Sequence, residues 1–134
     1  MELAALGALE AIAAAAREMG AIVAIAVVDP HGDLIAARRM DGARPRWMSA
    51  SLRKAYTAAV MDRDTAAFHE DMLRRHLDLA HYGDVRLTGL PGGVVVRDES
   101  GETVAGIGVT GNTGGRDAAL AELARACFDS ATTS

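Results

Sequence analysis

A chain of 134 residues with 50% hydrophobic and 24% charged residues is long enough for one domain with a buried core, so we take residues 1–134 as a single domain. A net charge of −4, without a stripe of lysine or arginine to neutralise phosphates, excludes a typical nucleic-acid-binding protein. No apolar run reaches the length of a transmembrane helix, so the sequence also argues against a membrane protein.

The first part of the chain predicts a helix followed by a β-hairpin. Residues 3–19 are rich in alanine, the best helix former, and Gly20 ends the pattern. Residues 21–28 are a continuous apolar run rich in β-branched side chains, which is typical of a strand buried on both faces. An Asp-Pro-His-Gly turn at 29–32 then leads into a returning strand at 33–40.

The rest of the chain predicts two helices, a second hairpin and a closing helix. The helices are expected at 46–62 and 64–80, the strands at 94–97 and 103–110, and the last helix at 116–129, after a glycine-containing loop. The order is therefore helix, hairpin, helix, helix, hairpin, helix. Two sequential hairpins indicate an antiparallel sheet, and the helices around it make an α+β fold.

One glycine motif invites a functional interpretation that we reject. Gly106, Gly108 and Gly111 match the G-x-G-x-x-G pattern of dinucleotide-binding domains, which needs a following helix and a further crossover strand. The residues after Gly111 suffice for one helix only. Glycines that alternate along a strand remove side chains from one face, so we expect a helix or a ligand to approach that face closely.

The expected location is the cytoplasm. The single cysteine, Cys127, excludes an internal disulfide, which suits a reducing compartment. The alanine-rich start superficially resembles the apolar part of an export signal, but it carries Glu2 and Glu10, and no lysine or arginine precedes it.

Several segments, in order along nearly the whole chain, resemble the GlcG/HbpS family, which includes the C-terminal domain of PduO-type proteins. They are DPHGDLIAARRMDGA at 29–43, KAYTA at 54–58, PGGVV at 91–95, GIGVTG at 106–111, and the aspartate at 117 that opens the last helix. The chain departs from the family pattern at Val95, where proline is common, at Thr110, where serine is common, and throughout 69–88.

The resemblance implies a profilin-like fold, an antiparallel sheet flanked by helices, that commonly assembles into homo-oligomers. Relatives of this kind include haem binders, a corrinoid-linked domain, and proteins encoded beside enzymes of glycolate oxidation. It therefore implies a small-molecule ligand, with haem as a possible cofactor.

Lys54 has two interpretations. It lies within an otherwise uncharged stretch of a predicted helix, where it is either a surface lysine or carboxylate partner, or a cation facing a pocket. In the second case it binds an anionic ligand, or acts as a base if burial lowers its pKa. Glycine loops that expose backbone N–H groups would complete an anion site. The candidate ligand-binding residues are Lys54, Thr57, Gly92, Gly93, Thr110 and Gly111.

Asp117 also has two interpretations. An acid in the first turn of a helix complements the helix dipole and caps the helix. Otherwise it orients Lys54 or accepts a proton, so Lys54 and Asp117 are the catalytic candidates if the protein is an enzyme.

Histidine is the usual protein ligand of haem iron. His69 and His76 are seven residues apart, which would place them on one face of the helix predicted at 64–80, and they are the candidate iron ligands. Each alone is more commonly a structural or surface residue than a ligand. His31 lies in the first hairpin turn and is expected to be exposed.

Three hypotheses remain open from the sequence. The first is a ligand-binding protein, for haem or a related tetrapyrrole. The second is a small enzyme without a cofactor, acting on a carboxylate or carbonyl metabolite by acid–base chemistry at Lys54 and Asp117. The third is an oligomeric accessory subunit that assembles through its first helix.

Overall fold

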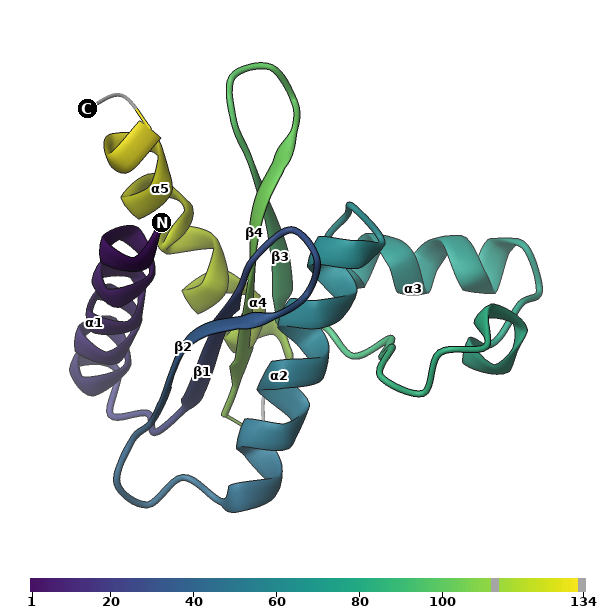
Figure 1. Cartoon of the computed structure of the whole chain (residues 1–134). Coiled ribbons are helices and arrows are strands. Elements are labelled where there is room, and N and C mark those ends of the chain that lie inside the picture. The colour runs from purple at the N-terminus through teal and green to yellow at the C-terminus, as the bar shows by residue number, and fades with distance from the viewer. Residues whose placement is uncertain (112–113, 133–134) are drawn as a thin grey trace.

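An open four-stranded antiparallel sheet, in the order β2-β1-β4-β3, lies at the centre of the computed structural model (Figure 1). The structure describes residues 1–111 and 114–132. The helices are α1 Glu2–Glu18, α2 Pro45–Val60, α3 Thr65–Arg74, the 3-10 helix η1 Leu79–Tyr82, α4 Gly114–Leu123 and α5 Arg125–Thr132. The strands are β1 Ala24–Val28, β2 Leu34–Arg39, β3 Gly93–Arg97 and β4 Thr103–Thr110. The predicted α+β architecture with its two hairpins is confirmed.

The central strand β1 is buried along its whole length, as its apolar sequence predicts. It pairs antiparallel with β2 on one side and with β4 on the other. The first hairpin turn is fixed locally, because the Asp29 carboxylate accepts hydrogen bonds from the backbone N–H groups of His31 and Asp33 at 2.8 and 3.1 Å. His31 is exposed in this turn, as expected.

Helices cover both faces of the sheet. Figure 1 shows α1 and α5 on one side and α2 on the other. On the first side, α1 packs through alanines such as Ala5 and Ala8, whose small side chains allow close approach to the strands. Leu9 and Ile12 are buried with these alanines, but Leu3 and Leu6 are 81% and 49% exposed, so α1 also presents apolar surface to solvent.

The alternating glycines of β4 lie where α2 crosses the sheet. A Cβ atom at Gly106 would lie 2.3 Å from the carbonyl oxygen of Ala55, and one at Gly108 would lie 2.0 Å from that of Ser51. Both distances are far below van der Waals contact, so only glycine permits this helix to pack on the strand. The motif therefore serves helix packing inside an antiparallel sheet, in agreement with rejection of the dinucleotide interpretation.

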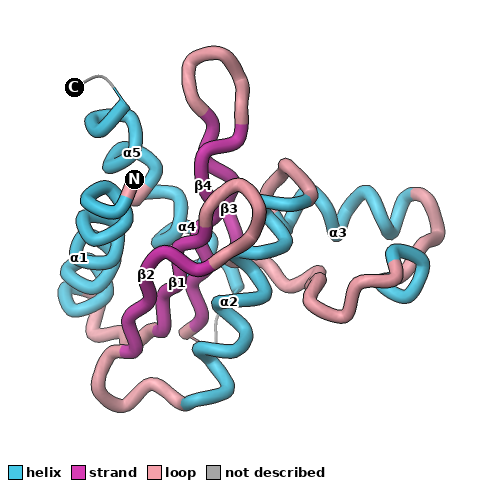
Figure 2. Tube along the Cα trace, viewed as in Figure 1, coloured by secondary structure: helices cyan, strands magenta, loops and turns pink. Residues whose placement is uncertain are grey.

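Two predicted helices differ from the structure. The helix expected at 64–80 ends at Arg74, and the chain then turns because His76 adopts a left-handed backbone conformation with φ of 57°. Figure 2 shows mostly loop from there to β3, interrupted by the short η1. The closing helix is divided into α4 and α5 around Ala124. Part of the predicted loop before it, residues 112–113, lies outside the described residues.

Within 1–111 and 114–132, none of the helices is both long and apolar enough to cross a membrane.

Candidate functional site

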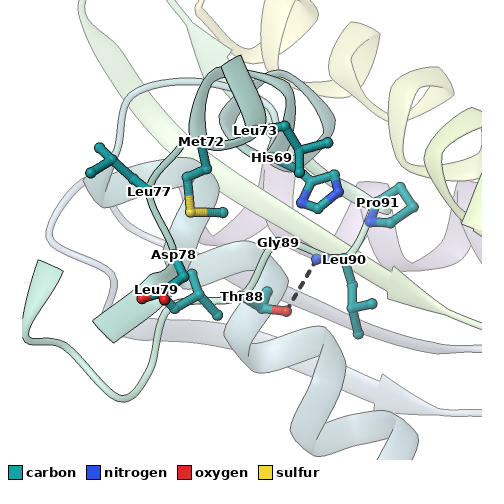
Figure 3. A pocket seen from close by; sticks show the side chains of 10 residues that line it. All are labelled: His69, Met72, Leu73, Leu77, Asp78, Leu79, Thr88, Gly89, Leu90 and Pro91. Carbon is teal, nitrogen blue, oxygen red and sulfur yellow. Dashed lines mark hydrogen bonds between the residues drawn. The ribbon is translucent and has the colours of Figure 1, made fainter. Parts of the chain in front are cut away.

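An apolar pocket of about 480 Å³ lies between α3, η1 and the segment that precedes β3 (Figure 3). Figure 1 shows that this part of the chain extends beyond α2, away from the sheet. The pocket is lined by His69, Met72, Leu73, Leu77, Asp78, Leu79, Thr88, Gly89, Leu90 and Pro91.

The sequence of α3 explains why the pocket forms here. Phe68 and Met72 are buried on the face of α3 that turns towards α2, where they pack with Tyr56 and Leu87. The rings of Phe68 and Tyr82 meet edge to face, with centroids 5.2 Å apart. This small cluster, separate from the main core, packs η1 against α3. Leu73, Leu77 and Leu79, which lie between these elements, line the pocket.

The loop that closes the pocket is stabilised by its own hydrogen bonds. The Asp78 side chain caps η1 by accepting from the backbone N–H of Ala80 at 2.9 Å, and the His81 ring nitrogen Nδ1 accepts from the Asp78 N–H at 3.1 Å. On the opposite wall, the Thr88 hydroxyl accepts a hydrogen bond from the N–H of Leu90 at 3.2 Å. Each of these hydrogen bonds is local to one wall, so they fix the conformation of the walls without crossing the pocket.

His69 is the histidine that lines this pocket. Figure 3 shows His69 and Met72 extending from α3 towards the loop segment that carries Gly89. A Cβ atom at Gly89 would lie 2.9 Å from His69 Nδ1 and 3.3 Å from the Met72 methyl carbon, so the glycine leaves room for both side chains. His69 is also exposed to solvent.

The prediction that His69 and His76 share a helix face is wrong. The helix ends at Arg74, and the left-handed conformation of His76 turns the chain away before the face repeats. His76 is exposed and does not line the pocket. The sequence prediction had no place for Leu73, Leu77 and Leu79 as pocket residues, although their apolar character within an otherwise polar segment was a visible signal.

Lys54 lies inside the protein, in an ion pair with Asp117. Its ammonium nitrogen Nζ is 3.5 Å from Asp117 Oδ2 and donates a hydrogen bond to the carbonyl oxygen of Val109 at 2.9 Å. The two side chains are only 4% and 3% exposed. Lys54 is also the only lysine of the chain. The interpretation of Lys54 as a carboxylate partner is confirmed, whereas the interpretation as a surface lysine is wrong.

Burial shifts the protonation equilibria of both partners. It lowers the pKa of Lys54 below its usual 10.5, an effect that the Asp117 carboxylate opposes. It raises the pKa of Asp117 above its usual 3.8, against the influence of the Gly111 N–H and of Lys54. Within the described part of the chain, no donor reaches Asp117 Oδ1 in hydrogen-bonding geometry. Asp117 lies in the first turn of α4, as predicted, and it also positions Lys54.

The glycines predicted to form an anion site pack directly around this pair. A Cβ atom at Gly92, whose φ is 118°, would lie 2.9 Å from Lys54 Nζ and 2.6 Å from the Val109 carbonyl oxygen. One at Gly93 would lie 2.5 Å from the Lys54 carbonyl oxygen, and one at Gly111 would lie 3.2 Å from Asp117 Oδ1. The structure therefore brings these residues together around Lys54, while their role in ligand binding stays a prediction.

The two predicted threonines make internal hydrogen bonds. Thr57, fully buried, accepts from the backbone N–H of Thr88 at 3.0 Å, which ties α2 to the wall of the apolar pocket. The Thr110 hydroxyl lies 2.8 Å from the Ser51 hydroxyl, which also bonds the Ala24 carbonyl. Thr57 therefore connects the Lys54 helix with the pocket, and Thr110 belongs to the contact between α2 and the sheet.

The comparisons with known proteins agree on one family. The family described as "Haem degrading protein HbpS-like" matches residues 2–126. An uncharacterized 15.0 kDa protein encoded in the dhaT-dhaS intergenic region of Citrobacter freundii is 33% identical over 124 residues, which cover 89% of this chain and 84% of that protein.

Solved crystal structures also resemble the chain in three dimensions. A double mutant of HbpS from Streptomyces reticuli is 31% identical, with a TM-score of 0.85 over 94% of this chain and 84% of that one. The complex of PduOC with haem is 23% identical, with a TM-score of 0.80 over 90% of this chain and 88% of that one, and shows that the fold is shared. With most of its length matched, the chain belongs to the HbpS-like family.

Proposed function

We propose that this chain binds haem or a related tetrapyrrole in the pocket between α3 and η1, with His69 as the axial ligand. The observation that carries the proposal is an imidazole on the wall of an otherwise largely apolar pocket of about 480 Å³. Histidine is the common haem ligand, and pockets of this size and lining hold medium-sized apolar ligands. The family description, which associates HbpS-like proteins with haem, supports the same ligand.

The pocket fits the chemistry of a tetrapyrrole in two respects. Its leucines, Met72 and Pro91 offer apolar contacts to a macrocycle, and Met72 adds a thioether of the kind that also binds haem iron. Neither a lysine nor an arginine is among the lining residues, and Asp78 is acidic, so the pocket has no permanent cation to pair with propionate groups. The propionates would therefore point towards solvent, past the exposed rim residues Leu73 and Leu90.

A hemin titration of the purified protein, followed at the Soret band, tests the proposal. We expect a sharp, saturable shift at one equivalent per chain, which His69→Ala should abolish or move to a different wavelength. His76→Ala is the matched control, because His76 is exposed, lies seven residues further on and is outside the pocket. A weak shift that does not saturate, or one that survives His69→Ala unchanged, would overturn the assignment.

A second candidate function rests on the buried Lys54–Asp117 pair. Two proton-exchanging groups with oppositely shifted pKa values are a common feature of acid–base catalytic sites, although structural ion pairs show the same shifts. In this case the protein would act on a small carboxylate or carbonyl compound. Turnover found in a substrate screen should disappear in Asp117→Asn and persist in His69→Ala, and the reverse pattern would reject this candidate.

The partner that the exposed face of α1 favours is a second copy of this chain. Leu3 and Leu6 are 81% and 49% exposed, on a helix whose buried face consists of alanines together with Leu9 and Ile12. Light scattering should show a homo-oligomer that dissociates in Leu3→Glu, whereas an unchanged mass would exclude α1 from the interface.

A further inference from the structure

A second, smaller pocket lies on the far side of α2 from the Lys54–Asp117 pair, where three distant segments converge. Val28 and Leu34 come from the first hairpin, Leu52, Arg53 and Tyr56 from α2, and Arg86 from the loop after η1. Its volume is about 140 Å³. None of its lining residues belongs to the apolar pocket that contains His69.

The turn of the first hairpin closes this pocket against the Tyr56 ring. Gly32 has φ of 88°, and a Cβ atom there would lie 2.4 Å from the ring carbon Cδ2 of Tyr56. Glycine at this position lets the turn rest on the ring. The walls are therefore apolar and held by packing, with Val28 buried and Leu34 57% exposed at the mouth.

Arg86 is fixed at the rim with its charge balanced. Its guanidinium lies over the Tyr56 ring at 4.0 Å from the centroid and donates to the Tyr56 hydroxyl at 2.5 Å. The hydroxyl donates in turn to the Asp84 carboxylate, which is 3.5 Å from Arg86 Nε. Asp84 therefore neutralises Arg86, and the hydrogen bond from Tyr56 holds the pKa of Asp84 below its usual value.

Arg53 supplies a second cation, and its charge is not balanced. Arg53 lines both this pocket and a neighbouring one, and its Nη1 donates to the carbonyl oxygen of Val85, on the wall of the neighbouring pocket, at 2.7 Å. Among the residues that the structure describes, no carboxylate lies within ion-pair distance of Arg53. Its remaining N–H groups are free to bind an anion, and a guanidinium matches the two oxygens of a carboxylate.

We propose that this pocket binds a small carboxylate with a short apolar tail, with Arg53 holding the carboxylate and Val28, Leu34 and Leu52 enclosing the tail. At roughly 30 Å³ per water-sized group, the pocket holds about five non-hydrogen atoms. That is the size of propionate, and butyrate is one carbon longer. A compact inorganic oxyanion would leave the apolar walls without a partner, which is why a carboxylate with a tail is the better match.

The proposal is tested by titrating the protein with butyrate, butyramide and inorganic phosphate, using calorimetry and NMR chemical shifts. Butyrate should bind saturably in the millimolar range and shift the signals of Leu52, Arg53 and Tyr56. Butyramide, which has nearly the same shape without the charge, should bind more weakly. Because a hydrogen bond to a charged group contributes about 1.5–3 kcal/mol, Arg53→Gln should weaken butyrate binding by roughly ten- to a hundred-fold.

The control is Arg74→Gln, which removes an exposed arginine of α3 that is absent from this pocket and should leave butyrate binding unchanged. Arg53 is exposed, so its replacement should keep the fold, which a thermal melt verifies. No saturable butyrate binding, equal binding of phosphate and butyrate, or binding that survives Arg53→Gln would each overturn the proposal. His69→Ala should not affect butyrate, so the result is independent of haem binding.

Discussion

Replacing Asp117 with asparagine should destabilise the fold strongly, because it leaves the Lys54 ammonium buried without its anion. Both side chains are more than nine-tenths buried, and removing one partner of such a pair typically costs about 3–5 kcal/mol. We expect the lower end, about 3 kcal/mol, because Lys54 keeps its 2.9 Å hydrogen bond to Val109. For a chain of this length, that corresponds to a fall in Tm of roughly 10–15 °C.

Urea unfolding of the single and double variants measures this effect. Lys54→Met alone should also destabilise the fold, since it leaves the Asp117 carboxylate buried without a cation. The double variant should lose less than the sum of the two single losses, with a coupling energy of about 2 kcal/mol.

An exposed ion pair supplies the control. Arg38 and Glu10 are closer, at 2.7 Å, but Glu10 is 66% exposed, so Glu10→Gln should cost no more than about 1 kcal/mol. If Asp117→Asn costs no more than Glu10→Gln, or if the losses of the double variant simply add, burial does not determine the strength of the Lys54–Asp117 pair.

Three further predictions concern packing and pH. Gly108→Ala should cost about 3 kcal/mol, since its Cβ would lie 2.0 Å from the Ser51 carbonyl oxygen, and a smaller loss in a thermal melt would disprove the close approach of α2. Gly7→Ala, where a Cβ meets nothing within 4 Å inside α1, should instead stabilise by about 0.5–1 kcal/mol, and a loss in the same melt would contradict this. The lowered pKa of Asp84 means that the folded state binds fewer protons than the unfolded chain, so stability should fall as pH drops below the usual value of 3.8 towards the folded pKa. Tyr56→Phe, which removes the first cause of that shift, should make the decline in urea stability with pH shallower, and an identical slope would argue against it.

The hairpins were predictable because their signals are local. Asp29, proline and glycine occupy a short turn, and the Asp29 carboxylate makes its hydrogen bonds within that turn. The ends of α3 and α4 were not predictable in the same way. A histidine at position 76 takes a conformation usually left to glycine, and no glycine or proline marks the break at Ala124. Tertiary packing decides both.

For the candidate sites, too, local signals predicted individual residues, whereas tertiary packing determined how they come together. The residue types pointed to His69, Lys54 and Asp117, and the backbone N–H groups of the glycine loops pointed to the glycines. The pocket around His69 depends on η1 and on residues 88–91 folding back under α3, which no local pattern encodes. The contact of Lys54 with Asp117 spans 63 positions of sequence, so only the three-dimensional structure could establish it.

Because the only lysine is buried, chemical labelling of its side chain can report how often the protein opens. A reagent that acylates lysine side chains reaches Nζ only when α2 parts from β4 and α4, since the Lys54 side chain is 4% exposed in the folded state. The slow appearance of one added mass on the peptide that carries Lys54 would then count rare opening events under native conditions, without denaturant. A ligand that binds only the folded chain should slow that labelling, and the slowing should grow with the ratio of ligand concentration to Kd. Mass spectra taken over time would therefore rank ligands for either pocket.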